Sequence, residues 1–376
     1  MALRFEGEYD LKMLLKTAIS MALVAMVALS LMPAVNAGEK KSLPVSHMIG
    51  NIPFHQQMNG LSCGAGSLEM VFDYWGPDID QKEIMNVARV SVNGIWNPDI
   101  VRAGQFSYMS SAMGYMFPQV GPEAGFVERG LGYAAFAFSS ERFWLPELKA
   151  LIASDIPVIV AMYSMPTGGG GHFRVVMGYD DSQELIYFID TWGRDTLHLN
   201  DWTGILPWTY TDFQSGWNYK EYGTAHPYSG PYFGAIVLPW TVDVDVKGKQ
   251  TAGSTITVSA SITYPCPAPF NSAMFPASDA FASISLPTGM TLVSPSGEIS
   301  MGTLGAGERA TVSWTVHCGQ DCSGAAISVT ACGLVSGHVP DAERIYLPES
   351  RSDEQAKCYP AYDYTDMIGG TGFVSF

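Results

Sequence analysis

Cysteine is scarce in most of this 376-residue chain, where Cys63 is the only one before Cys266. The other four lie closer to the C-terminal end: Cys318, Cys322, Cys332 and Cys358. A zinc finger is excluded, because no His/Cys pair at metal-ligand spacing accompanies Cys318 and Cys322. In an oxidising compartment the five later cysteines predict disulfides, with one thiol left over and the pairing open. Cys63 is expected to stay outside any disulfide.

Basic residues are also few, with 20 Lys and Arg against 36 Asp and Glu, which gives a net charge of −16. Nucleic-acid binding needs clustered Lys and Arg, so we expect no nucleic-acid partner. The glycine run at 168–171 is not followed by Gly-Lys-Ser/Thr, which excludes a phosphate-binding loop of that type. We expect neither a cofactor nor a metal, because these histidines lack ligand spacing: His47, His55, His198, His226, His317 and His338.

Beyond the N-terminus the chain lacks any apolar run long enough to cross a bilayer. The one marked run, 18–32, follows Lys12 and Lys16 and leads into small residues ending at Ala37. This order is typical of a secretory signal, so residues 1–37 are predicted to be a signal peptide cleaved after Ala37. The alternative is an uncleaved membrane anchor, for which the run is short against the roughly 20 residues of a span. The protein is expected to be secreted, periplasmic or at the cell surface.

Residues 38–240 have the pattern of an α+β domain. Apolar residues at helical spacing after Cys63 predict a helix, and Asp80 with Glu83 forms a capping-box signature. Helices are expected at 63–75, 80–90 and 145–154, and strands at 158–163, 172–179 and 184–190. The turn residues at 180–182 predict that the last two strands form an antiparallel hairpin.

Residues 241–348 change to short alternating runs of Thr, Ser and Val separated by Gly- and Pro-rich turns. Strands are expected at 255–263, 281–286, 310–316 and 326–330. This pattern predicts an all-β immunoglobulin-like sandwich. Residues 349–376 mix charges, Gly and Tyr, and are expected to form a C-terminal tail held by Cys358.

Cys63 stands at the start of a predicted helix, which is a favourable position for a nucleophilic thiolate. A catalytic thiol also needs a nearby imidazole, and His172, after the glycine run, is the best candidate. Taken alone, a histidine at the edge of a strand is more often a structural residue than a catalytic one. The function of the pair therefore depends on the residues that accompany it.

Asp190 closes the second strand of the predicted hairpin and can face His172, orienting the imidazole and stabilising its protonated form. Gln57, six positions before Cys63, is the candidate side-chain donor to an oxyanion, together with the backbone N–H of Cys63. Gln56 is a rival that ranks lower on spacing. Taken alone, Asp190 could be a turn residue and Gln57 a surface glutamine, but the order Gln, Cys, His, Asp is specific as a set.

The segments that carry these residues resemble the bacteriocin-processing (double-glycine leader) peptidase-like family of papain-like cysteine peptidases. The resemblance covers roughly residues 45–240 and departs from the family pattern at Ala65 and Thr191, where the family usually has proline. The matching segments occur in the family's order: 52–57, 63–68, 73–76, 148–153, 156–160, 171–180, 186–193 and 209–213 with Trp217.

The resemblance implies a papain-like fold with Cys63 as nucleophile, His172 as base, Asp190 as orienting acid and Gln57 in the oxyanion hole. The leading hypothesis is an exported cysteine peptidase that hydrolyses peptide or protein substrates, with a β-domain that contacts a cell-surface or protein partner. Two alternatives stay open: a catalytically inactive papain-fold binding or adhesion module, and a transglutaminase-like acyl transferase.

Overall fold

The computed structural model describes residues 42–76, 79–90, 94–107, 131–193, 204–221, 228–319, 324–340 and 361–375. The predicted signal peptide, Cys322 and Cys358 lie outside these residues. All the elements given below belong to the compact unit 44–376. In the described ranges, no helix is both long and apolar enough to cross a membrane.

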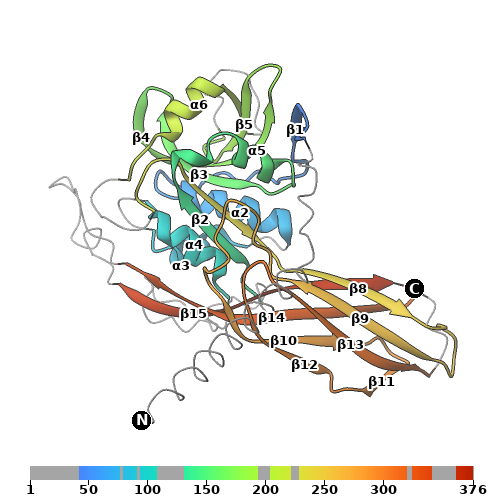
Figure 1. The fold of residues 1–376 in the computed structure, drawn as a ribbon. Coiled ribbons are helices and arrows are strands. Elements are labelled where there is room, and N and C mark those ends of the chain that lie inside the picture. The colour runs from blue at the N-terminus through green and yellow to red at the C-terminus, as the bar shows by residue number, and fades with distance from the viewer. Residues whose placement is uncertain are drawn as a thin grey trace, which may run out of the picture. The chain divides into compact units, whose positions relative to one another are not determined.

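The N-terminal part of the described chain is built on a seven-stranded antiparallel sheet (Figure 1). Its path runs β2-β7-β3-β4-β5-β6, and β1 pairs with β4. The strands are β1 (Ser46–Met48), β2 (Ala134–Ser139), β3 (Val158–Met165), β4 (Gly168–Asp180), β5 (Leu185–Asp190), β6 (Ile205–Thr209) and β7 (Phe233–Leu238).

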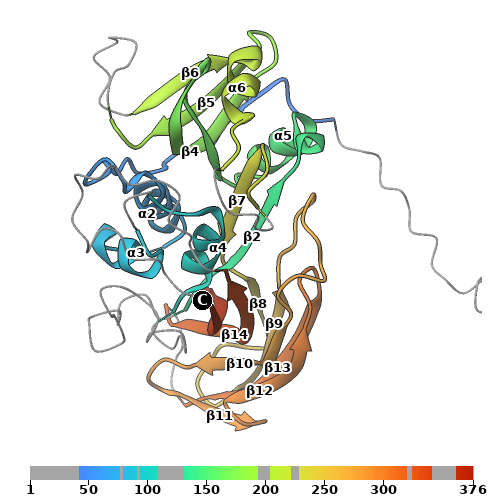
Figure 2. The same cartoon turned by 90° about the vertical axis from the view of Figure 1, so that its left-hand side faces the viewer.

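Helices α2, α3 and α4 contact one another on one side of this sheet, and α5 lies on the other (Figure 2). α6 packs against β3, β5 and β6. The helices are α2 (Cys63–Trp75), α3 (Gln81–Val87), α4 (Asn97–Gln105), α5 (Pro146–Ile152) and α6 (Tyr210–Trp217), with a short 3-10 turn at Glu141–Phe143. The helices predicted at 80–90 and 145–154 are therefore shorter than expected, while α4 and β2 had no counterpart in the sequence-based prediction.

α2 is buried along its first ten residues, so its N-terminal end is embedded rather than amphipathic. A Cβ atom on Gly64 would lie 2.9 Å from Ile95 Cδ1 and 3.1 Å from Phe173 Cδ2. On Gly66 it would lie 3.2 Å from Thr191 Cγ2. The two glycines thus let the start of α2 approach β4 and the residues that follow β5.

β4 and β5 form the predicted antiparallel hairpin, with Arg174 directly opposite Asp190. The glycine run that precedes His172 is part of β4, because the strand begins at Gly168 and pairs with the end of β3. The hydroxyl of Tyr219 lies against Gly171, where a Cβ atom would clash with it. Gly171 has no side chain, and the ring of Tyr219 occupies the space that this leaves.

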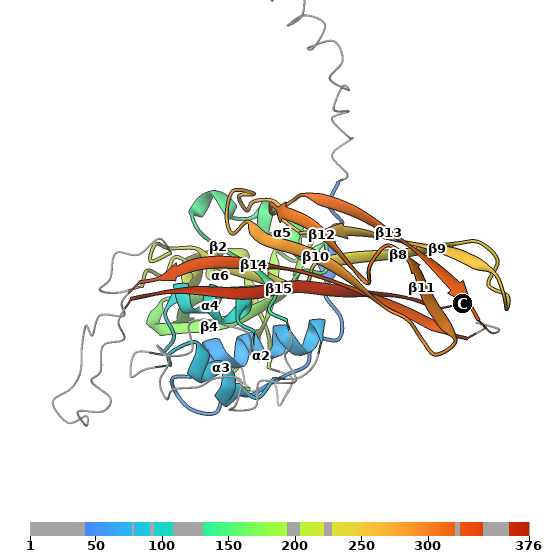
Figure 3. The ribbon, with the colours of Figure 1, turned by 90° about the horizontal axis from the view of Figure 1, so that it is seen from below.

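The C-terminal part is all β, in two four-stranded antiparallel sheets with the orders β12-β10-β14-β15 and β11-β13-β9-β8 (Figure 3). In β9 and β13 buried and more exposed residues alternate, as expected for strands with one face in a core. The strands are β8 (Thr241–Lys247), β9 (Thr255–Thr263), β10 (Ala277–Ser285), β11 (Met290–Ser294), β12 (Glu298–Leu304), β13 (Arg309–Cys318), β14 (Ala326–Val339) and β15 (Tyr362–Ser375).

β15 lies in the segment that the sequence places in a C-terminal tail, yet it pairs with β14 from Tyr362 to Ser375. The expected disulfides are absent among the described cysteines, since Cys266, Cys318 and Cys332 all carry free thiols. Burial raises the pKa of the Cys332 thiol to about 11. Within the described part of the chain, the β-region is therefore held by pairing and packing.

The hairpin of β14 and β15 contacts α4 through buried polar groups. Arg102 Nη1 lies 2.9 Å from Oδ2 of Asp366, and neither side chain is exposed to solvent. Tyr364 donates a hydrogen bond of 2.5 Å to Oε1 of Gln105. Gly132, next to β2, bridges to Ile368 in β15. The β-region is thus joined to the α+β part by an interface that contains a desolvated ion pair.

Candidate active site

Cys63 is the first residue of α2, and its side chain is 8% exposed. The preceding residue, Ser62, makes no side-chain cap to the helix, so its hydroxyl does not occupy the first N–H groups of α2. Backbone hydrogen bonds from Phe173 and Gly64 reach the sulfur. A negative charge on Cys63 is therefore favoured by oriented backbone dipoles.

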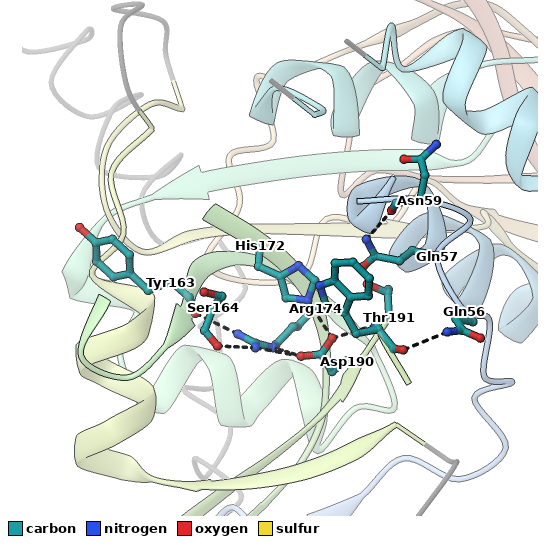
Figure 4. Close-up of polar contacts among 10 residues, drawn as sticks. Gln56, Gln57, Asn59, Tyr163, Ser164, His172, Arg174, Asp190 and Thr191 are labelled. Carbon is teal, nitrogen blue, oxygen red and sulfur yellow. Dashed lines mark hydrogen bonds and ion pairs between the residues drawn. The ribbon is translucent and has the colours of Figure 1, made fainter. Parts of the chain in front are cut away.

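His172 lies on β4 between Cys63 and Asp190 and is 4% exposed. Its Nε2 lies 2.8 Å from Oδ1 of Asp190, which closes β5 (Figure 4). This leaves Nδ1 for the hydrogen bond that His172 makes with Cys63. Three of the residues singled out in the sequence are thus brought together in the order Cys63, His172, Asp190.

The protonation states of these groups depend on one another. Burial acts to raise the pKa of Cys63, but the hydrogen bond and the charge of His172 outweigh it and lower that pKa below its usual value. Burial acts to lower the pKa of His172, yet hydrogen bonds with Asp190 and Cys63 raise it to about 9. Both directions describe a thiolate paired with an imidazolium.

Asp190 is 1% exposed. Burial acts to raise its pKa, but the hydrogen bond with His172 and the charge of Arg174 hold the pKa well below the usual range of a carboxyl. The backbone N–H of Trp192 also donates to Oδ1 over 2.9 Å. The residue therefore carries a fixed negative charge next to the imidazole.

Gln57 is buried, at 6% exposure, whereas Gln56 is exposed and donates to the backbone carbonyl of Trp192. Thr191 donates a hydrogen bond of 2.7 Å to Oε1 of Gln57, and Gln57 Nε2 donates to the carbonyl of Asn59 over 2.6 Å. An amide nitrogen has two hydrogens, so one N–H of Gln57 is left for another acceptor. Burial and fixation both favour Gln57 over Gln56 as the candidate donor.

Two residues that hold this site together, Arg174 and Thr191, were not among those predicted from the sequence. Arg174 binds Asp190, and Thr191, noted only as a departure from a family pattern, orients Gln57. Arg174 had a visible signal, because it is a lone charge inside the apolar strand His-Phe-Arg-Val-Val-Met. A buried charge requires a partner, which predicts an acidic residue on the neighbouring strand.

In the ranges that the structure describes, no three His, Cys, Asp or Glu side chains gather in a way that could hold a metal ion. The chemistry available to Cys63, His172 and Asp190 is a nucleophilic sulfur, a proton carrier and a fixed anion. Such a set suits acyl transfer through a covalent intermediate on the sulfur.

Residues 49–225 match the model of the Peptidase_C39 like family. Among solved structures the chain is similar to xylellain, a cysteine protease from Xylella fastidiosa, with 14% sequence identity and a TM-score of 0.36. That similarity covers 52% of this chain and 87% of xylellain. No curated protein matches the chain. The family match identifies residues 49–225 as a Peptidase_C39-like, papain-like cysteine peptidase domain, and the protein as a cysteine peptidase.

Proposed function

We propose that the protein hydrolyses peptide bonds with a catalytic triad of Cys63, His172 and Asp190. The observation that carries this proposal is the hydrogen-bonded chain from the Cys63 sulfur through His172 to Asp190, in which Cys63 has a lowered pKa. The thiolate attacks the carbonyl carbon of the scissile bond and forms a tetrahedral intermediate.

The negative charge on the substrate oxygen is stabilised by Gln57 Nε2 and by the backbone N–H of Cys63. His172 then gives its proton to the leaving amine as the C–N bond breaks, which leaves a thioester on Cys63. In the second half of the reaction His172 takes a proton from water as the hydroxide attacks the thioester. The acid product leaves, and the thiolate–imidazolium pair is restored.

Replacing the nucleophile tests this proposal. Cys63→Ala is compared with wild type and with Cys266→Ala, which removes a partly exposed thiol in the β-region. With a peptide library as substrate, hydrolysis is expected to disappear in Cys63→Ala and to continue in Cys266→Ala. Unchanged hydrolysis in Cys63→Ala would contradict the assignment of Cys63 as the nucleophile. Adding an amine acceptor to the same assay separates hydrolysis from transfer, because a transferase would yield a product that carries the amine.

The β-region from β8 to β15 is proposed to be an immunoglobulin-like sandwich that contacts a protein or cell-surface partner. Its support is the pair of four-stranded antiparallel sheets with alternating burial. The protein is further proposed to be exported, with residues 1–37 as the signal peptide. N-terminal sequencing of protein collected outside the cytoplasm tests this directly, since it should begin after Ala37.

A further inference from the structure

The two carboxylate oxygens of Asp190 have different partners. Oδ1 faces His172 Nε2 at 2.8 Å and the backbone N–H of Trp192 at 2.9 Å. Oδ2 accepts from Arg174 Nε over 2.9 Å, and Arg174 Nη2 lies 2.8 Å from the same oxygen (Figure 4). The oxygen that does not face the imidazole is therefore held by a guanidinium.

Arg174 is itself fixed on every side and is 2% exposed. Nη1 donates to the carbonyl of Tyr163 and Nη2 to that of Ser164, both over 2.9 Å. Its guanidinium carbon lies 4.9 Å from the ring centre of Trp208 and 5.1 Å from that of Phe188. Because the planar group is bonded at its edges and packed on aromatic rings, it forms a rigid support for the carboxylate.

The strand register explains this arrangement. Arg174 lies directly opposite Asp190 on the paired strands β4 and β5. His172 is two residues earlier on β4, so it projects from the same face of the sheet as Arg174. A single carboxylate at the end of β5 can therefore reach both side chains.

We propose that Arg174 is a positioning residue of the active site, which fixes Asp190 through Oδ2 and keeps it ionised while Oδ1 orients His172. This inference rests on the proposed catalytic triad. It adds a fourth member that does not contact substrate and acts only through Asp190.

The charges support this role. With Arg174, the buried groups alternate as thiolate, imidazolium, carboxylate and guanidinium, so each anion has a cation beside it. An opposite charge within about 4–6 Å lowers the pKa of a carboxyl by about 1–3 units. Without Arg174, Asp190 would depend on His172 alone for a countercharge at a site that is closed to water. It would then take up a proton at a pH where the wild-type carboxylate stays charged.

The other groups around the pair do not replace this charge. Besides Asp190, Cys63 on α2 has the largest effect of a titratable group on the pKa of His172, and it is part of the same chain of charges. β3 contributes the carbonyls of Tyr163 and Ser164, while the phenol ring of Tyr163 packs against that of Tyr219. Tyr219 adds a second phenol against Gly171. Phenols carry no charge in the acid range of the test.

The consequence is a shift in the pH dependence of the thiol. Protonation of Asp190 removes the anion that stabilises the imidazolium, and a neutral His172 no longer stabilises the Cys63 thiolate. The loss of Arg174 should therefore move the acid limb of Cys63 reactivity to higher pH.

The test is the rate of Cys63 alkylation by iodoacetamide against pH, read at the Cys63 peptide by mass spectrometry. This readout needs no knowledge of the substrate. We expect Arg174→Met to raise the midpoint of the acid limb by about 1 pH unit or more. Arg174→Lys keeps the positive charge but loses the planar guanidinium that binds Oδ2 of Asp190 through both Nε and Nη2. Its midpoint should therefore lie between those of wild type and Arg174→Met.

Arg89→Met is the matched control. Arg89 is also buried and paired, with Nε 2.6 Å from Oδ1 of Asp99. Its loss should lower the melting temperature without moving the midpoint. If folded Arg174→Met has the wild-type midpoint, the inference is overturned and Arg174 is only structural. If Arg174→Met does not fold, Arg174→Lys is the variant that tests the inference. A raised midpoint of Cys63 alkylation in Arg174→Lys supports the inference, and an unchanged midpoint overturns it.

The same experiment separates this inference from the proposed function. A wild-type Cys63 that reacts only in alkali, like an ordinary thiol, contradicts the catalytic triad itself. A wild-type Cys63 that reacts in mild acid, with no shift in the Arg174 variants, leaves the triad intact and contradicts only the role of Arg174.

Discussion

Thr191 donates a hydrogen bond of 2.7 Å to Oε1 of Gln57, which lies 134 positions earlier in the chain. The backbone N–H of Gln57 in turn donates to the carbonyl of Thr191 over 2.8 Å. Because the hydroxyl occupies the amide oxygen, it fixes which end of the Gln57 amide can serve as donor. Thr191 directly follows Asp190, so one short segment orients both the imidazole and the proposed oxyanion donor.

Thr191→Val should therefore lower kcat by roughly tenfold, which is a part of the loss expected when an oxyanion donor is removed entirely. Valine keeps the shape of threonine but leaves Oε1 of Gln57 without its donor, so the amide is held only by the hydrogen bond from Nε2 to the carbonyl of Asn59. Thr191→Ser keeps the hydroxyl and should recover most of the activity. Peptide hydrolysis by the two variants checks this, and a loss in Thr191→Ser with wild-type activity in Thr191→Val would mean that packing of the methyl group, not the hydrogen bond, matters.

Peptide hydrolysis should fall on the alkaline side as pH rises through about 9, the raised pKa of His172. Above that pH the imidazole is neutral, so it cannot protonate the leaving amine and no longer pairs with the thiolate. Because the pKa of Cys63 is lowered, the thiolate persists to a lower pH than that of an ordinary thiol. A profile of kcat/KM against pH tests both limbs. An alkaline limb near the pKa of an unperturbed histidine, about 6.5, would contradict the account.

Asp190→Asn should reduce kcat by between about 10² and 10⁴. The amide must turn its NH₂ toward either His172 or Arg174, and both are donors. The variant should also lose about 3–5 kcal/mol of unfolding free energy, because it leaves the buried Arg174 without its anion. Activity assays and denaturant unfolding measure the two effects.

Asp181→Asn is the matched control for Asp190→Asn. Asp181 also pairs with a cation, with Oδ2 2.5 Å from Lys149 Nζ, but its side chain is 36% exposed. Its removal should cost less than about 1 kcal/mol and leave kcat unchanged. Comparable losses of activity in both variants would show that carboxylate loss acts through global stability.

The placement of the proposed catalytic residues side by side could be predicted, because local sequence patterns locate the elements that carry them. The apolar spacing after Cys63 located α2, and the turn at 180–182 paired the strands that carry His172 and Asp190. The side-chain partners could not be predicted, since they depend on register and on contacts across the fold. A shift of one residue between β4 and β5 would place a different side chain opposite Asp190.

β15 could not be recognised for a different reason. Its sequence contains Gly369, Gly370 and Gly372, and glycine is depleted in strands. In the structure the carbonyl oxygens of Trp240 and Val242 lie where Cβ atoms on Gly370 and Gly372 would be. The glycines therefore allow a close approach of two backbone segments. In the sequence alone, the same glycines are typical of a loose tail.

The buried ion pair between Arg102 and Asp366 should make the β14–β15 hairpin necessary for the stability of the peptidase part. Asp366→Asn is expected to lower the unfolding free energy by about 3–5 kcal/mol, because it leaves Arg102 buried without an anion. Asp363→Asn on the same strand is the control, since the exposed pair of Asp363 with His338 should contribute less than about 1 kcal/mol. Denaturant unfolding followed by tryptophan fluorescence measures both, and equal small effects would contradict the prediction.

In the proposed mechanism, His172 makes Cys63 a thiolate nucleophile. Alkylation of wild type and His172→Ala with iodoacetamide at about pH 5, where an ordinary thiol is protonated, measures this effect. We expect Cys63 to react far faster than Cys266 in wild type, and this difference to disappear in His172→Ala. Equal reactivity of Cys63 and Cys266 in wild type, or full reactivity of Cys63 without His172, would contradict it.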